Sequence, residues 1–131
     1  MGMKRKSSKY DPDRSQDQTW WRALGEGEQI ECVEEQHRRA GIKLPNAKLH
    51  AMTHVIVENQ VLLGDETPVA STLQRLMTDG LDRHDAIHAI GSVLAPLLFD
   101  ILGGEIRSEP NLIYYQQLRE LTAERWLSED A

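Results

Sequence analysis

The residues most able to do chemistry in this chain are its histidines. Four of the five fall into two pairs with a spacing of four residues, His50 with His54 and His84 with His88. Residues four apart lie on the same face of an α-helix. Glu58 extends the first pair by the same step. The spacing therefore predicts two helices that each present metal ligands from one face.

Imidazole nitrogens bind Zn²⁺, Fe²⁺, Ni²⁺ and Cu²⁺, and two histidines four residues apart on a helix can chelate one ion. His50 and Glu58 lie about 12 Å apart along a helix axis at about 1.5 Å per residue, so one ion cannot readily take all three ligands of the first helix. Two arrangements stay open. Either one ion takes neighbouring ligands from each helix, or two ions share His50, His54, Glu58, His84 and His88. We expect a transition-metal cofactor (Zn, Fe or Ni), with Glu58 as a ligand or as the catalytic general base.

The two helices that must position these ligands are indicated by their capping residues. The first is predicted over about 47–63, after Asn46 at its cap, and the second runs from Asp82 toward Leu102. Both are apolar on more than the histidine face, so we expect them to be enclosed and their histidines buried. If a shorter helix within 67–80 spans the bundle, the two histidine helices run parallel and their histidine pairs lie at the same level.

The rest of the chain is also predicted to be helical, and no segment shows strand alternation or an internal repeat. Three further helices are expected: one at the Trp20-Trp21 pair, one over about 28–40, and a final one that starts at Ser108 or Glu109 with Pro110. The predicted fold class is all-α, a single-domain bundle of four to five helices over residues 17–131. Of the two adjacent tryptophans we expect one to pack and the other to face outward, or both to form a partner surface.

Small residues follow the second histidine pair. Gly91 and Ala95 share its face and would let another helix approach closely at that point. Pro96 is expected to kink the same helix, because proline cannot donate the backbone hydrogen bond at its position.

The fifth histidine, His37, stands apart from this pattern. It follows Glu34 with the Glu-x2-His spacing that carboxylate-bridged di-iron bundles use. Its neighbours Glu35, Arg38 and Arg39 indicate a solvated face instead. We therefore leave His37 outside the predicted site.

Length and composition set further limits. A chain of 131 residues can bury a hydrophobic core without stabilisation by disulfide bonds or structural metals. The single cysteine, Cys32, excludes an internal disulfide. It is interpreted as a small buried apolar residue. No uninterrupted apolar run reaches the roughly 18 residues needed to span a bilayer. The first 19 residues are polar, without a secretory pattern. We expect a cytoplasmic, bacterial protein that does not enter a membrane.

Charge is distributed unevenly along the chain. The net charge is −6, yet residues 1–14 carry five basic and two acidic side chains. The acidic remainder argues against broad nucleic-acid binding, which needs lysines and arginines massed on one face. Residues 1–16 are expected to be a disordered basic tail, whose Lys4-Arg5-Lys6 cluster is the one segment suited to RNA or anionic lipid.

The two histidine motifs resemble those of a known group of proteins. Leu49-His50-x3-His54-x3-Glu58-x-Gln60 and Asp82-x-His84-x-Ala86-x-His88-Ala89-Ile90 are similar to the motifs of a bacterial family of small helical proteins catalogued as a domain of unknown function. The likeness covers about 49–100. It implies an all-helical fold and carries no activity.

A weaker resemblance is to hemerythrin. The di-iron site of that family uses a His-x3-Glu helix and a His-x3-His helix, matched here by His54 with Glu58 and by His84 with His88. The likeness implies a di-iron centre that binds oxygen. The final His-x4-Asp element of that family has no counterpart in this chain.

These observations leave competing functions open. The first is a metal-dependent site between the two histidine helices, of hydrolytic type, in which the ion lowers the pKa of a bound water and Glu58 acts as ligand or base. The alternative is a non-catalytic helical interaction module, with a structural metal or none, that forms a homodimer or pairs with another protein through the tryptophan-bearing end helices. A third is pH sensing by buried histidines without metal.

Overall fold

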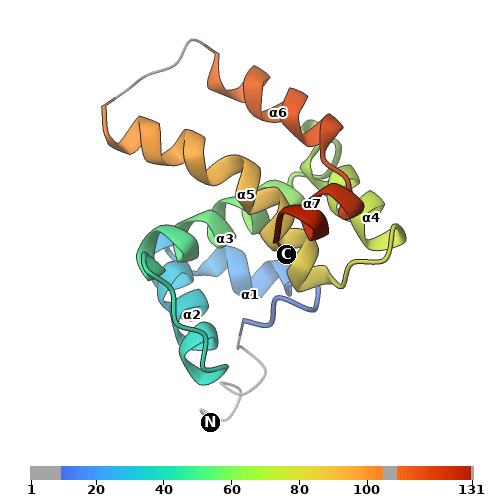
Figure 1. Cartoon of the computed structure of the whole chain (residues 1–131). Helices are drawn as coiled ribbons and strands as arrows, with labels where there is room; N and C mark the ends of the chain where they lie inside the picture. The colour runs from blue at the N-terminus through green and yellow to red at the C-terminus, as the bar shows by residue number, and fades with distance from the viewer. Residues whose placement is uncertain (1–9, 105–108, 131) are drawn as a thin grey trace, which may run out of the picture.

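The computed structural model describes residues 10–104 and 109–130, and these residues are helical without any strand. The described helices are α1 (Gln18–Ala23), α2 (Glu26–Arg39), α3 (Ala47–Leu62), α4 (Val69–Thr78), α5 (Arg83–Leu102), α6 (Pro110–Glu120) and α7 (Ala123–Asp130), with a short 3₁₀ turn at Gly64–Glu66. Figure 1 shows them packed into one bundle. The predicted all-α fold class is confirmed.

The described part has seven α-helices, more than the four to five predicted for the bundle. One reason is that the predicted final helix is divided in two. Leu121 adopts an extended backbone at the end of α6. The hydroxyl of Thr122 then accepts a hydrogen bond from the backbone N–H of Arg125 at 3.1 Å, which caps α7. Ser108, one of the two residues expected to start the final helix, lies outside the described residues.

Both histidine-bearing helices begin at the predicted caps. Asn46 Oδ1 accepts from the backbone N–H of Leu49 at 3.1 Å, which starts α3. Asp82 Oδ1 accepts from the backbone N–H of Asp85 at 2.8 Å, which starts α5. Each cap satisfies a backbone donor that has no partner inside the helix. The caps therefore fix where along each helix the histidines lie.

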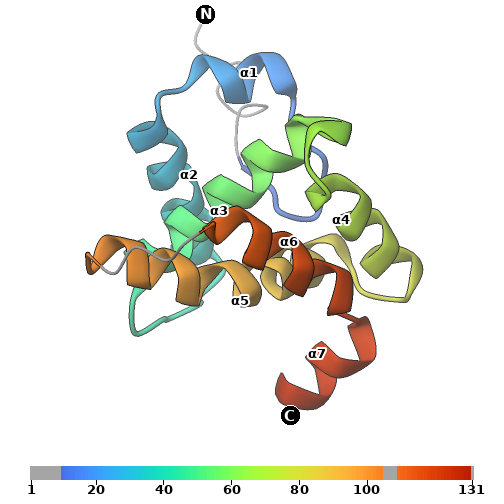
Figure 2. The ribbon, with the colours of Figure 1, turned by 90° about the horizontal axis from the view of Figure 1, so that it is seen from above.

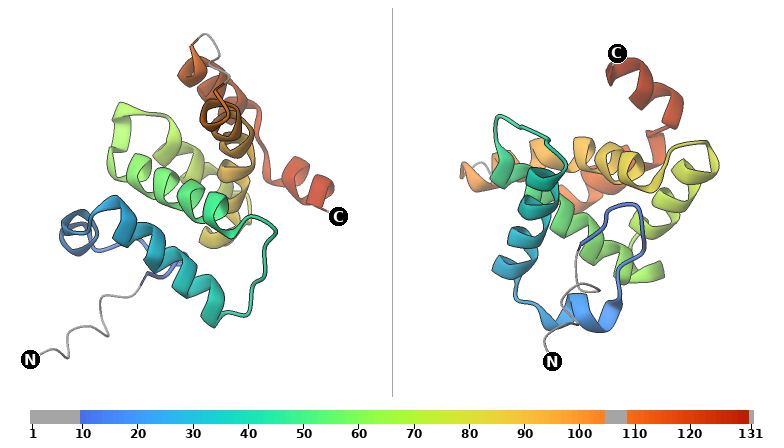
Figure 3. Two further views of the ribbon diagram at one scale, coloured as in Figure 1. Left: turned by 90° about the vertical axis from the view of Figure 1, so that its left-hand side faces the viewer. Right: turned by 90° about the horizontal axis from the view of Figure 1, so that it is seen from below.

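The central helix of the fold is α3, which packs against α2 on one side and α5 on the other. Figure 3, left, shows it between these two helices, and Figure 2 shows α6 lying along α5 with α4 beside them. The main core forms where α3, α4, α5, α6 and α7 meet, and a smaller core is shared by α1, α2 and α3. The expectation that α3 is enclosed on two sides is confirmed.

The smaller core contains one of the two tryptophans. Trp21 is fully buried and its indole N–H donates to Asn59 Oδ1 at 2.7 Å. Trp20 is partly exposed, and its ring centroid lies 5.9 Å from that of Trp21. The ring of Tyr10 lies on Trp21 as well, with centroids 5.4 Å apart. One tryptophan therefore packs and its neighbour is partly exposed.

The close approach of α3 and α5 depends on Gly91. A Cβ atom at this position would lie 2.9 Å from Thr53 Cγ2, closer than carbon atoms pack. The prediction that a small residue lets two helices approach just beyond the second histidine pair is confirmed at Gly91. This contact brings the histidine faces of the two helices together.

The segment before α1 is packed, not disordered, wherever the structure describes it. Tyr10 is 3% exposed and Pro12 is fully buried. The Arg83 guanidinium donates to the carbonyl of Pro12 at 3.0 Å, and the backbone N–H of His84 donates to Asp13 Oδ1 at 3.2 Å. The prediction that residues 1–16 form a disordered tail does not hold at Tyr10 and Pro12, which are buried. Residues 1–9, with the basic Lys4-Arg5-Lys6 cluster, lie outside the described residues.

Helix α5 is long and apolar enough to cross a membrane by length and composition alone. The sequence analysis discounted this segment because polar residues interrupt its apolar run. In the structure α5 packs against α3, α4 and α6, and it buries Ile87, Ile90 and Leu94 in the main core. It is therefore a core helix of the bundle that also carries two of the candidate ligands.

Candidate metal centre

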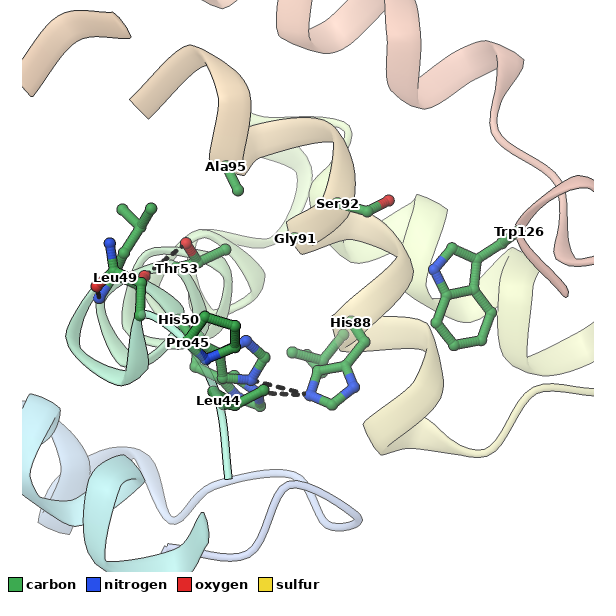
Figure 4. Close-up of a pocket in the computed structure, with 13 residues that line it drawn as sticks. Leu44, Pro45, Leu49, His50, Thr53, His88, Gly91, Ser92, Ala95 and Trp126 are labelled. Atoms are coloured by element: carbon green, nitrogen blue, oxygen red, sulfur yellow. Dashed lines mark hydrogen bonds between the residues drawn. The ribbon is translucent and has the colours of Figure 1, made fainter. Parts of the chain in front are cut away.

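All five histidines of the chain converge on one point between α2, α3 and α5. The Nε2 atoms of His88 and His54 lie 3.0 Å apart, and His50 Nε2 lies 3.2 Å from the Nε2 atoms of both His88 and His37. The ring of His84 is next to that of His88, with centroids 4.3 Å apart. Figure 4 shows His50 and His88 pointing toward one another across the gap between α3 and α5. The predicted convergence of the two histidine pairs is confirmed.

The sequence analysis missed one residue of this cluster. His37, on α2, is 5% exposed and belongs to the group of four residues, with His54, His84 and His88, whose ligand atoms all lie within 4.8 Å of one another. The charged neighbours Arg38 and Arg39 do mark a solvated face, but His37 lies on another face of the helix. Gln29 and Val33 precede it at four-residue steps and are also buried. That spacing is the signal that would have placed His37 toward the interior.

The distances between the ring nitrogens match those around a single ion. Ligands about 2.1 Å from one metal lie about 3.0 Å apart at the 90° angles of five- or six-fold coordination, and about 3.4 Å apart in a tetrahedron. The shortest Nε2 to Nε2 distances here are 3.0 and 3.2 Å. The cluster can therefore hold one metal ion, and the spacing of these nitrogens lies between that of five or six ligands and that of four.

Hydrogen bonds at Nδ1 fix the orientation of two of the rings, those of His37 and His54. His37 Nδ1 lies 3.0 Å from the carbonyl of Val33, to which only an N–H can donate. His54 Nδ1 lies 2.9 Å from the hydroxyl of Tyr10, whose own proton is donated to Glu58 Oε2 at 2.8 Å. Tyr10 must then accept from His54 Nδ1–H. Both rings consequently present an unprotonated Nε2 to the cluster, the form that binds metal.

Hydrogen bonds among the histidines cannot satisfy these contacts. The four Nε2 atoms form a chain of three contacts, from His37 to His50, from His50 to His88, and from His88 to His54. The two end nitrogens carry no proton, so only His50 and His88 can supply one each. Two protons serve at most two of the three contacts. His84 Nε2 is also buried, without a hydrogen-bond partner in the described part of the chain. One cation could be held by His37, His54, His84 and His88, whose ligand atoms all lie within 4.8 Å of one another.

The protein environment keeps the rings neutral. Burial, together with a smaller effect of the neighbouring histidines, lowers the pKa of His50 to about 4 and that of His88 to about 3. Burial also lowers the pKa of His37, and it lowers the pKa of His54 well below the usual value. Neutral imidazoles are the form that a metal requires, so the site favours metal over protons at neutral pH.

Glu58 lies behind the cluster, where it contacts other partners. It is 1% exposed, and the guanidinium of Arg83 donates to both of its carboxylate oxygens at 2.9 Å. Tyr10 donates to the same carboxylate and separates it from His54. The structure does not bring Glu58 together with the five histidines, and its predicted role as ligand or general base has no support in this arrangement.

Two pockets reach the cluster, and His50 lines both of them. The first, which we name the apolar pocket, has a volume of about 440 Å³. Its walls come from the α2–α3 loop and α3 on one side and from α5 and Trp126 on the other (Figure 4), and His50, His54 and His88 line its inner end. The second pocket, of about 360 Å³, lies between α2 and α3 and includes His37, His50, Arg38 and Lys43. The centre is thus accessible from outside the bundle.

Comparisons with protein-family models, with curated proteins and with solved structures find no match to this chain. What the cluster does must be argued from its own geometry.

Proposed function

We propose that this protein binds one divalent transition-metal ion through His37, His54, His84 and His88, with His50 as a fifth ligand. The observation that carries the proposal is the set of three short Nε2 to Nε2 contacts that hydrogen bonds alone cannot satisfy. An ion replaces those unfavourable contacts with five metal–nitrogen bonds. The ring orientation imposed by Val33 and Tyr10 supports this, because metal-binding histidines commonly donate their other N–H to an oxygen acceptor.

The spacing favours some metals over others. Zn²⁺ prefers four ligands in a tetrahedron, whereas the separation of 3.0 Å between His54 Nε2 and His88 Nε2 corresponds to a ligand angle of about 90° and the separations of 3.2 Å to about 100°. Imidazole ligands in that arrangement suit Fe²⁺ or Ni²⁺. Among the metals considered from the sequence, we infer that Fe²⁺ or Ni²⁺ is the natural occupant.

Hydrolysis through Glu58 is less well supported than metal binding itself. A general base must lie within hydrogen-bond reach of the water that it activates. Glu58 is neutralised by Arg83 and is directed toward Tyr10. We therefore propose that Glu58 is a positioning residue, which holds Tyr10 and through it the ring of His54.

The direct test is elemental analysis of protein purified without a polyhistidine tag. We expect about one transition-metal ion per chain, as for a mononuclear site. The double variant His54→Ala with His88→Ala should lose nearly all of that metal, because it removes the contact between α3 and α5 ligands. Loading the metal-free protein with Co²⁺ should give the weak visible absorption of five- or six-fold coordination, since tetrahedral Co²⁺ absorbs much more strongly.

The matched control is Cys32→Ser. Cys32 is the chain's one thiol, and it packs in the smaller core on another face of α2, so its loss should leave the metal content unchanged. Metal far below one ion per chain in the native protein, or equal metal in the native protein and the double variant, would remove the proposed function.

A second candidate is self-association. Phe99 and Leu102 on α5 and Leu112 on α6 are each more than half exposed, which is unusual for large apolar side chains. We propose that these side chains contribute to a homodimer contact, at a place other than the tryptophan-bearing end helices expected from the sequence. Light scattering after size-exclusion chromatography should report a dimer that Phe99→Asp converts to a monomer, and a native monomer at high concentration would contradict it.

A further inference from the structure

We propose that the apolar pocket binds a small apolar carboxylic acid, whose carboxylate coordinates the metal and whose hydrocarbon body fills the pocket. This inference rests on the proposed metal centre and adds a ligand class to it. It starts from the position of the pocket, which has the imidazoles of His50, His54 and His88 at its inner end.

The lining of the pocket selects for an apolar body. None of the described residues that line it carries a charged side chain. Its two hydroxyls are used inside their own helices, since Thr53 donates to the carbonyl of Leu49 at 2.9 Å and Ser92 donates to that of Ala89 at 2.7 Å. Asn46 Oδ1 is occupied as the cap of α3. A ligand with polar groups along its body would lose hydrogen bonds to water without replacing them.

The charge of the centre selects for one anionic group. Five neutral imidazoles leave the two positive charges of a divalent ion uncompensated, and the buried carboxylate of Glu58 is already neutralised by Arg83. An isolated charge in a poorly solvated site is costly unless an opposite charge approaches it. A carboxylate meets this need through the metal alone. A phosphate would need several further hydrogen-bond donors, and the side-chain donors among the non-histidine lining residues that are not used inside their own helices are the Asn46 amide and the Trp126 indole N–H.

The size and shape of the pocket limit the body of the acid. A volume of about 440 Å³ is near the lower end of small-molecule sites. Gly91 and Ala95 make part of the α5 wall low, and the indole of Trp126 lies beside Ser92 on that same side of the pocket (Figure 4). A single aromatic ring or a short branched chain fits a pocket of this size.

The experiment uses protein loaded with Co²⁺ and three probes that separate head group from body. Phenylacetate has both features, phenylacetamide keeps the ring without the charge, and acetate keeps the charge without the ring. We expect phenylacetate to bind and to shift the visible absorption of Co²⁺. The other two probes, and phenylacetate added to metal-free protein, should bind at least about tenfold more weakly by calorimetry, a loss of about 1.4 kcal/mol.

Two variants test the location. Ala95→Leu should fill the pocket and weaken phenylacetate binding by at least about tenfold while the Co²⁺ content stays the same. Ala23→Leu, at an exposed alanine of α1 away from the pocket, is the matched control and should change neither quantity. Trp126→Ala removes an aromatic side chain that lines the pocket and should also weaken binding. This second variant keeps the test decisive if Ala95→Leu does not fold.

The possible outcomes distinguish failure of the metal centre from failure of the ligand assignment. If the protein takes up no Co²⁺, the metal centre itself fails and this inference fails with it. If Co²⁺ binds normally but phenylacetate leaves its spectrum unchanged, only the ligand assignment is overturned. Equal affinity for acetate and phenylacetate, or full affinity in both the Ala95→Leu and Trp126→Ala proteins, overturns it as well.

Discussion

At the scale of single residues, the site depends on groups that form hydrogen bonds with the histidine nitrogens facing away from the cluster. His54 donates to Tyr10, Tyr10 donates to Glu58, and Glu58 is held by two hydrogen bonds from Arg83. Every group in this series of hydrogen bonds has a partner, so the buried ion pair between Arg83 and Glu58 is fully hydrogen-bonded even though it is away from water. The consequence is a ring of His54 that is oriented before any metal arrives.

Tyr10→Phe tests this support. The substitution keeps the aromatic body and removes the hydroxyl that joins His54 to Glu58. We expect metal affinity to fall by about tenfold to a hundredfold, the usual effect of losing a partner behind a ligand. Competition with a chromogenic chelator measures the loss. Trp21→Phe, which removes the hydrogen bond to Asn59 in the same small core, should leave metal affinity nearly unchanged, and equal losses in the two variants would contradict the role given to the hydroxyl.

His50 differs from the other ligands because it lines both pockets and is only partly buried. We expect His50→Gly to keep metal on the other four histidines with reduced affinity, and we expect added imidazole to restore it by entering the space left behind. Isothermal titration with and without imidazole checks this. His54→Gly, at a position that is 1% exposed, offers no such access and should not be rescued. Rescue of neither variant would mean that His50 is not an accessible ligand.

At the scale of elements, the site is made by the contact between α3 and α5. The methyl group of Thr53 occupies the space where a side chain on Gly91 would begin, so the two helices are as close as their residues permit. The distance between His54 and His88 is set by the same contact.

Gly91→Ala is expected to push the helices apart. The added Cβ would meet Thr53 Cγ2 at 2.9 Å, so the free energy of unfolding should fall by about 1–3 kcal/mol and metal affinity should fall with it. Thr53→Ser removes that methyl group, keeps a hydroxyl for Leu49, and should restore both in the double variant. Urea unfolding and metal titration measure the two effects.

The matched control is Gly27→Ala on α2, where an added Cβ meets nothing within 4 Å. It should stabilise the protein by about 0.5–1 kcal/mol through helix propensity, without any change in metal binding. Failure of Thr53→Ser to offset Gly91→Ala would show that this contact does not set the spacing of the ligands.

At the scale of the whole molecule, folding lowers the pKa of four histidines, His37, His50, His54 and His88, and so links stability to pH. The folded-state pKa values of His50, about 4, and His88, about 3, lie below the usual value of 6.5 for an unfolded chain. Between these values the unfolded chain binds more protons than the folded one, so acid favours unfolding.

The metal-free protein should therefore lose stability as the pH falls from about 6.5 toward 4, and the loss should level off below about 3, where folded and unfolded chains are both protonated. Urea unfolding at a series of pH values measures it. A His50→Gln, His88→Gln variant should show a flatter profile, and bound metal should raise the unfolding midpoint at pH 7 because the ion binds only the folded chain. If the variant showed the same dependence of stability on pH as the native protein, the acid sensitivity would come from residues other than His50 and His88.

The sequence by itself determined the features that depend on neighbours along the chain. The caps at Asn46 and Asp82 bind backbone groups three residues away, and the pairs His50 with His54 and His84 with His88 follow from the helical repeat. Such short-range geometry is the same wherever a helix forms. The all-α fold and four of the five clustered histidines could be predicted for this reason.

Only the tertiary structure decided the rest. It turned His37 toward the interior, buried Tyr10 against His54, and paired Glu58 with Arg83, a residue 25 positions away. These contacts join segments that are far apart in the sequence, and sequence separation does not determine how far apart such segments lie in space. A carboxylate four residues from a histidine on a helix can bind a metal or pair with an arginine equally well. Which partner Glu58 meets depends on how α5 and the segment before α1 pack against α3, and that packing made it a support of the site.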